Sequence, residues 1–202
     1  MCELILASQS PRRRELLQLL GHPFKVLVSG VEEELVDGET PADHVTRLAE
    51  LKARDVGSRM EHGIVIGADT IVVLDNEILG KPSSPEEAIV MLMKLQGRTH
   101  RVYTGFALFD TSTGNMRSDY EATEVTMASM TECCAKRYVE TGEPLDKAGS
   151  YGIQGYGATL VTSIDGCYFT VMGLPLAKLM KALYTFSEGR FGYFGISSEQ
   201  TL

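Results

Sequence analysis

Apolar and polar positions follow one another along the chain in blocks that predict strands interleaved with helices. Short apolar runs predict strands, and apolar residues spaced three and four apart predict helices. The predicted strands cover residues 4–7, 24–28, 64–74, 99–109 and 117–128, and a later hairpin turns at 165–166. The predicted helices cover residues 11–20, 41–59, 85–95, 131–140 and 175–186. This order predicts a mixed α/β fold.

Three of the predicted helices begin with the same signal, a serine or threonine followed by proline. The pairs are Ser10-Pro11, Thr40-Pro41 and Ser84-Pro85. A hydroxyl at the N-cap accepts a hydrogen bond from a free backbone amide, and proline suits the first helical position because an N–H has no partner there. The first pair therefore places a helix N-terminus directly after the apolar strand 4–7.

Length and composition are those of an ordinary globular protein. The 202 residues include 44% hydrophobic and 23% charged side chains. Such a chain can bury one sizeable core without disulfides or metals. We expect a single domain over residues 1–186 and a loosely held tail over 187–202, in which Phe191, Tyr193 and Phe194 could dock against a partner or the body.

The formal charge of −8 disfavours nucleic acid and anionic membranes as partners, so any phosphate site must be local. The start of the chain is unlike a signal peptide. The apolar runs along the whole chain are too short to span a bilayer. The four cysteines form no Cys-x-x-Cys motif, and the four histidines form no i,i+4 pair. We therefore expect reduced thiols in a cytoplasmic protein, and histidines on the surface.

The first candidate for chemistry is the segment from Ala7 to Arg14, where two serines and three arginines surround a predicted helix N-terminus. Backbone N–H groups, the helix dipole and guanidinium groups together favour bound phosphate. The alternative is an N-cap followed by a solvated basic turn. Because cations oppose the dipole at this end of a helix, we favour an anion site.

Asp69 lies within the apolar strand 64–74, where an ionised carboxylate must meet a cation, a metal or several donors. The alternative is a solvated aspartate at a bulge beside Gly67. Two lysines could serve such a site. Lys52 lies on the apolar stripe of a helix, from which it could instead extend to the rim, and Lys81 follows the next turn.

Two loops offer further groups. The run Glu32-Glu33-Glu34 is typical of a solvated loop, although one of its carboxylates could join Asp69 in binding a divalent ion. The glycine-rich segment 142–157 lets the backbone approach a ligand closely. Its Gln154 carries both a donor and an acceptor, as recognition of a base edge requires.

Together these segments resemble the Maf family of nucleotide pyrophosphatases, which are related in fold to the inosine triphosphate pyrophosphatases. The resemblance covers residues 3 to about 186. It rests on motifs in the family's order: Leu6-Ala7-Ser8-Gln9-Ser10-Pro11-Arg12-Arg13, Gly67-Ala68-Asp69-Thr70, Gly80-Lys81-Pro82, Leu95-Gln96-Gly97-Arg98-Thr99-His100, and Asp146-Lys147-Ala148-Gly149 running into Tyr151-Gly152-Ile153-Gln154-Gly155. It implies a mixed α/β fold in which a long twisted sheet is flanked by helices and two lobes surround a deep cleft. It also implies a homodimer.

The resemblance further implies hydrolysis of dTTP and UTP, and of CTP or modified pyrimidine nucleotides, to the monophosphate and pyrophosphate with Mg²⁺ or Mn²⁺. Asp69 would be the general base and, with Glu33, would serve the metal or the attacking water. The triphosphate would be held by Ser8, Arg13, Lys52 and Lys81. The catalytic residues would be Asp69, Lys81 and Glu33. Choice of the base would involve Arg12, Thr70 and Gln154.

The expected reaction is in-line attack of water on the α-phosphorus, with cations neutralising charge on the transferring centre and on the leaving pyrophosphate. Two other functions stay open from the residues alone. One is a sibling enzyme that acts on purine or modified purine triphosphates. The other is a nucleotide-binding regulator of cell division without turnover.

Overall fold

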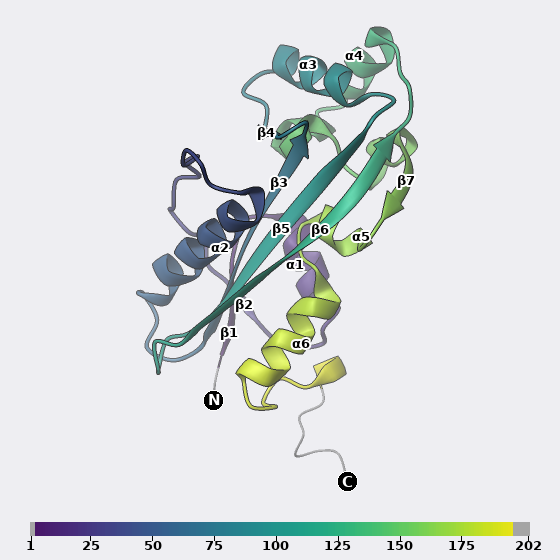
Figure 1. The fold of residues 1–202 in the computed structure, drawn as a ribbon. Coiled ribbons are helices and arrows are strands. Elements are labelled where there is room, and N and C mark those ends of the chain that lie inside the picture. Colours follow the sequence, from purple (N-terminus) through teal and green to yellow (C-terminus); the bar gives the residue numbers. More distant parts are fainter. Residues whose placement is uncertain (1–2, 196–202) are drawn as a thin grey trace. The chain divides into compact units, whose positions relative to one another are not determined.

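The computed structural model describes residues 3–195 and has the elements drawn in Figure 1. The strands are β1 (Leu4–Ala7), β2 (Lys25–Val26), β3 (Ile64–Leu74), β4 (Glu77–Leu79), β5 (Thr99–Asp110), β6 (Met116–Met127) and β7 (Val161–Asp165). The α-helices are α1 (Pro11–Gln18), α2 (Pro41–Gly57), α3 (Pro85–Leu95), α4 (Glu132–Glu140), α5 (Tyr168–Met172) and α6 (Leu176–Phe186). Short 3₁₀ helices are η1 (Glu143–Asp146), η2 (Ala148–Ser150), η3 (Gly155–Leu160) and η4 (Tyr193–Gly195).

The strands form a seven-stranded mixed sheet in the order β2-β1-β3-β5-β6-β7, with β4 paired to β3. Strand β1 runs parallel to β2 and β3, whereas β3–β4 and β6–β7 are antiparallel pairs. The predicted mixed α/β class, a sheet flanked by helices, is confirmed. The cleft that the family resemblance implies stays a prediction.

The chain divides into two compact units. Unit 1 comprises Met1–Asp69, Thr104–Glu121 and Gly173–Leu202, and unit 2 comprises Thr70–Tyr103 and Ala122–Met172. A buried cluster of unit 1 joins β1, β3 and β5 to α2 through Ile5, Ala7, Ala49, Ala53, Val56, Val65 and Ala107. In unit 2 the buried cluster includes Leu79, Leu92, Leu95, Val102, Val125 and Tyr138. Each unit thus has apolar packing of its own.

The predicted helix starts are confirmed by hydrogen bonds at the N-caps. Ser10 Oγ accepts from the Arg13 amide at 3.4 Å. Thr40 and Ser84 do the same for α2 and α3, each at 3.2 Å. These are local contacts between residues three apart, and this is why the sequence pattern is sufficient to predict them.

Two strand predictions need correction. The strand predicted over 24–28 is confined to β2, Lys25–Val26, and β4 was not predicted, although Asp75 and Asn76 adopt the left-handed conformation of a hairpin turn. The hairpin at 165–166 is wrong, because β7 pairs with β6 and the chain then enters α5. The Thr123 hydroxyl bonds both the amide and the carbonyl of Cys167, and so fixes this exit from the sheet.

The surface position expected for the histidines is wrong for three of the four. His62 is exposed, whereas His22, His44 and His100 are buried. His22 contacts the C-terminal segment, where Phe191 packs edge-on against its ring and Gly192 O lies 2.6 Å from Nε2.

Of the aromatic residues expected to dock, Phe191 is therefore buried, whereas Tyr193 and Phe194 are exposed. The rest of the predicted tail, 196–202, lies outside the described residues. Among the helices of residues 3–195, none combines the length and the apolar content that crossing a bilayer requires.

His100 is a buried polar anchor within unit 2. Its Nε2 lies 2.7 Å from Tyr151 Oη, and the two rings meet edge to face. Its Nδ1 is buried and has no hydrogen-bond partner in the described part of the chain. Burial lowers the pKa of His100 to about 4, because the imidazolium form would lose its hydration.

We expect this histidine to make the protein sensitive to acid. In the unfolded chain this histidine becomes protonated as the pH falls below about 6.5, whereas in the native protein it stays neutral until about pH 4. The free energy of unfolding therefore falls as the pH falls through this range. At pH 5 the loss amounts to ~2 kcal/mol of unfolding free energy. Urea unfolding at pH 7 and at pH 5 measures how much the free energy of unfolding falls between the two pH values. In His100→Gln this fall should be smaller than in wild type by that amount. The exposed His62→Gln is the control, and an unchanged pH dependence in His100→Gln would contradict the assignment.

Candidate active site

A buried lysine between two carboxylates forms the centre of the candidate site in unit 1. Asp69 in β3 is 4% exposed and Lys52 in α2 is 7% exposed. Lys52 Nζ donates to Asp69 Oδ1 and to Glu33 Oε1, each at 2.7 Å. Asp69 is therefore paired with a cation, as predicted, and the solvated aspartate and the lysine extending to the rim are both excluded.

Glycines in the strands allow helix α2 to approach closely enough for this pairing. A Cβ on Gly67 would lie 2.0 Å from Ala49 O and 2.8 Å from Ala53 N. A Cβ on Gly105 would lie 2.4 Å from Val45 O. The backbone of α2 thus rests directly on the strands, and this places its buried face, which includes Lys52, against β3.

Glu33 lies in a loop that is tethered on both sides. Before it, Asp55 Oδ2 accepts from Ser29 Oγ at 2.8 Å and from the Gly30 amide at 2.9 Å. These bonds, that of Gly30 first, hold the pKa of Asp55 below its ordinary value. After it, Arg47 Nη2 donates to Glu34 O at 3.0 Å. Sequence reasoning missed Asp55 and Arg47, because neither stands in a recognisable motif.

Arg13 and Ser8 form a second group at the N-terminus of α1. Ser8 Oγ lies 3.3 Å from Arg13 Nη1, and Arg13 Nε donates to Gly173 O at 2.9 Å. Burial lowers the pKa of Arg13, whereas Asp69 and Glu33 oppose this shift and Arg12 adds to it. The guanidinium nonetheless remains charged. A half-buried cation thus stands within the field of the site carboxylates at a helix end suited to anions.

The other predicted residues, Thr70, Lys81 and Gln154, belong to unit 2. The loop before Lys81 is tied down by the Gly149 amide, which donates to Gly80 O at 3.0 Å. The Gln154 side chain is exposed, and its carboxamide has no hydrogen-bond partner among residues 3–195. Ser8, Arg12, Arg13, Glu33, Lys52 and Asp69 lie in unit 1. The gathering of both sets in one site stays a prediction.

The donor set for a metal is small. Among the residues that the structure describes, no three His, Cys, Asp or Glu side chains are grouped as a metal site would require. Glu33 and Asp69 are nevertheless joined through one ammonium group. Two carboxylates can hold Mg²⁺ when phosphate oxygens and water supply the remaining ligands. The residues therefore fit a metal that binds together with a phosphorylated ligand.

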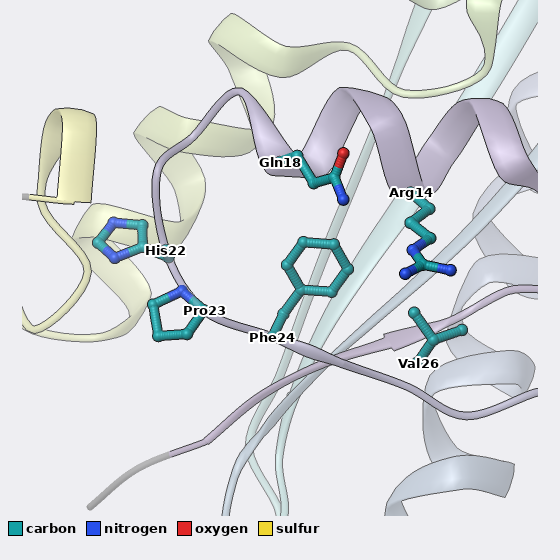
Figure 2. A pocket seen from close by; sticks show the side chains of 6 residues that line it. All are labelled: Arg14, Gln18, His22, Pro23, Phe24 and Val26. Atoms are coloured by element: carbon teal, nitrogen blue, oxygen red, sulfur yellow. The ribbon is translucent and has the colours of Figure 1, made fainter.

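A separate pocket of about 420 Å³ lies in unit 1 on another face of α1. Figure 2 shows the side chains of Arg14 and Gln18 projecting from the helix toward Phe24 and Val26 of the following segment. None of the predicted site residues lines this pocket. Helix α1 thus directs Arg13 to the candidate site and the neighbouring Arg14 elsewhere.

The buried Lys52, the half-buried Arg13 and the N-terminus of α1 are groups that can bind a phosphorylated, anionic ligand. The sequence matches the Maf-like protein family over residues 3–186. The chain belongs to the Maf family.

Several relatives carry the name dTTP/UTP pyrophosphatase. The protein of Desulforamulus reducens is 50% identical over 186 residues, which is 92% of this chain and 97% of the relative. That of Bacillus pumilus is 51% identical with the same coverage. That of Bacillus cytotoxicus is 52% identical over 189 residues, 94% of this chain and 98% of the relative. A solved structure, the Staphylococcus aureus Ham1 protein, aligns with a TM-score of 0.48 at 14% identity, over 98% of this chain and 88% of that one.

We expect Gly67→Ala to destabilise the protein, because the new methyl group meets the backbone of α2, which cannot rotate away. The free energy of unfolding should fall by about 3 kcal/mol, the upper range for an overpacked core. Urea unfolding measures this change. Gly30→Ala is the matched control, since its Cβ meets nothing within 4 Å. Equal stability of the two variants would show that α2 does not need the close approach.

Proposed function

We propose that this Maf family protein is a nucleoside triphosphate pyrophosphatase that hydrolyses dTTP and UTP, and also CTP or modified pyrimidine nucleotides, to the monophosphate and pyrophosphate. The observation that carries the proposal is the buried Lys52 held between Asp69 and Glu33. The half-buried guanidinium of Arg13 interacts electrostatically with both carboxylates. Relatives named dTTP/UTP pyrophosphatase, 50% and 51% identical, support the choice of substrate.

Asp69 acts as the general base in this proposal. Lys52 holds its Oδ1, whereas Oδ2 accepts no hydrogen bond within the described residues. Oδ2 is therefore the oxygen that takes the proton from water as the water oxygen bonds to the α-phosphorus. The bond from that phosphorus to the bridging oxygen breaks, and pyrophosphate leaves with the electron pair. Proton transfer to a positioned carboxylate accelerates such a step about 10²- to 10⁴-fold.

The cations bind the substrate and offset its charge. Ser8, Arg13, Lys52 and Lys81 hold the triphosphate, and Lys81 and Glu33 complete the catalytic set with Asp69. Fixed cations that face the transferring phosphoryl group stabilise charge developing in the transition state. Arg12, Thr70 and Gln154 select the base.

A divalent cation, Mg²⁺ or Mn²⁺, belongs to the proposal. Glu33 and Asp69 would hold it, and when bound it would neutralise negative charge on the phosphate oxygens. Lys52 bridges these two carboxylates and keeps them together before the ligand arrives.

The remaining parts of the proposal concern organisation. We assign the activity to residues 1–186 as one catalytic domain, with 187–202 as a C-terminal tail. We further propose a homodimer that works in the cytoplasm on small nucleotides, with no role for nucleic acid or membranes.

We expect pyrimidine triphosphates to be the preferred substrates in a direct assay. Release of monophosphate and pyrophosphate is measured for dTTP, UTP, CTP, dATP, GTP and ITP, with Mg²⁺, with Mn²⁺ and with a chelator. The expected result is turnover of dTTP and UTP that the chelator abolishes. Preference for purine triphosphates would support the pyrophosphatase activity but reject the proposed selection of pyrimidine bases. Binding without turnover would instead indicate the nucleotide-binding regulator.

Removing the charge of Asp69 should abolish most of the activity. Asp69→Asn keeps an oxygen for Lys52 but cannot take the proton, so kcat for dTTP should fall at least about a hundredfold. Calorimetry with dTTP shows whether the variant still binds nucleotide. The exposed Asp37→Asn is the matched control. Near-normal turnover in Asp69→Asn would reject the general-base role.

A further inference from the structure

The glycine-rich loop of unit 2 is built around one carboxylate, that of Glu143 at the start of η1. Its Oε2 accepts from the Tyr156 amide at 2.9 Å, and its Oε1 accepts from the Gly157 amide at 3.0 Å. Tyr138 Oη of α4 donates to Oε1 at 2.8 Å and accepts from the Gly152 amide at 3.0 Å. One carboxylate and one phenol thus bind three backbone amides of a six-residue span, 152–157.

The glycines of this span leave the space that the two side chains occupy. A Cβ on Gly155 would lie 2.3 Å from Glu143 Oε2, and one on Gly157 would lie 2.2 Å from Gly152 O and 2.6 Å from Tyr138 Oη. Gly155 also has a φ of +62°, a conformation that other residues adopt at a cost. A side chain at Gly155 would therefore collide with Glu143, and one at Gly157 would collide with Tyr138 and with the backbone at Gly152.

The carboxylate is stabilised in its charged form. Burial alone would raise the pKa of Glu143, but the bonds from Gly157, Tyr138 and Tyr156 outweigh it and hold the pKa below its ordinary value. Hydrogen bonds to an ionised acceptor are about twice as strong as those between neutral groups. The loop therefore has a strong anchor near neutral pH.

Gln154 lies between the anchored amides. The bonded amide of Gly152 precedes it by two residues, and that of Tyr156 follows it by two. The Gln154 side chain itself is exposed and has no partner among the described residues. The anchors consequently hold the backbone while the carboxamide stays available to a ligand.

We infer that Glu143, held by Tyr138, is a positioning residue that sets the contact of Gln154 with the nucleotide base. The inference rests on the proposed function, in which Gln154 selects the base. Glu143 touches neither substrate nor metal in this scheme. Its effect should therefore appear in binding of the base and be absent from the chemistry at the phosphorus.

The test is steady-state kinetics of Glu143→Gln with dTTP and UTP. The glutamine NH₂ group cannot accept a hydrogen bond from a backbone amide, so one oxygen of the carboxylate is lost as an acceptor and the loop loses its anchor. KM should rise about tenfold, the equivalent of one charged hydrogen bond, while kcat stays within about twofold. Inhibition by pyrophosphate should be unchanged, because pyrophosphate has no base. Glu140→Gln, an exposed neighbour, is the matched control.

Two further variants separate positioning from a general loss of structure. Tyr138→Phe removes the hydroxyl and should raise KM in the same way, with the exposed Tyr168→Phe as its control. In a Gln154→Ala background, Glu143→Gln should change KM less than about twofold, because the two residues act through one contact.

Several outcomes would overturn the positioning role. These are an unchanged KM in Glu143→Gln, an equal fall in affinity for pyrophosphate, a loss confined to kcat, or a full effect of Glu143→Gln when Gln154 is already alanine. A wild-type protein that turns over no nucleotide would reject the proposed function and the positioning role with it. Wild-type turnover with unaltered variants would reject the positioning role alone.

Discussion

The buried ion pair of Lys52 and Asp69 is the constraint on which much of unit 1 depends. Removing two charges from water costs several kcal/mol per ion unless their geometry and hydrogen bonds compensate. The helix must therefore present Lys52 toward β3, and the strand must lack a side chain at Gly67 so that the helix comes close enough. Glu33 supplies a second acceptor, and the tethers of its loop keep it there. Helix phase, glycine position and loop conformation all follow from one pairing.

The parts that sequence predicts well are those set by neighbours in the chain. The N-caps of α1, α2 and α3 involve residues three apart, and the long strands are continuous apolar or alternating runs. The pairing of Asp69 was also predictable, since an ionised group in an apolar strand has few alternatives. The sequence offered two candidate lysines as its partner. The structure shows that Lys52 contacts it, with Nζ 2.7 Å from Asp69 Oδ1.

The parts that sequence could not supply depend on contacts between distant segments. His22 is buried because residue 191 packs on it, and His100 because residue 151 does. The hairpin prediction at 165–166 failed because Thr123, far away in the chain, captures Cys167. Glu143 carries no motif signal of its own, since an acid near glycines is common. Its importance is visible only once three amides converge on it and its phenol partner.

The packing of the glycine-rich loop also bears on how this protein could be redesigned. Side chains at positions 155 and 157 would collide with Glu143 and Tyr138, and one at 152 would meet Lys147 Cε at 3.1 Å. A library that randomises the whole loop would therefore consist mostly of damaged proteins. Position 154 is different, because its side chain projects outward from a backbone that its neighbours hold. Under the proposed role of Gln154 in selecting the base, saturation mutagenesis at that single codon is the economical route to an altered base preference.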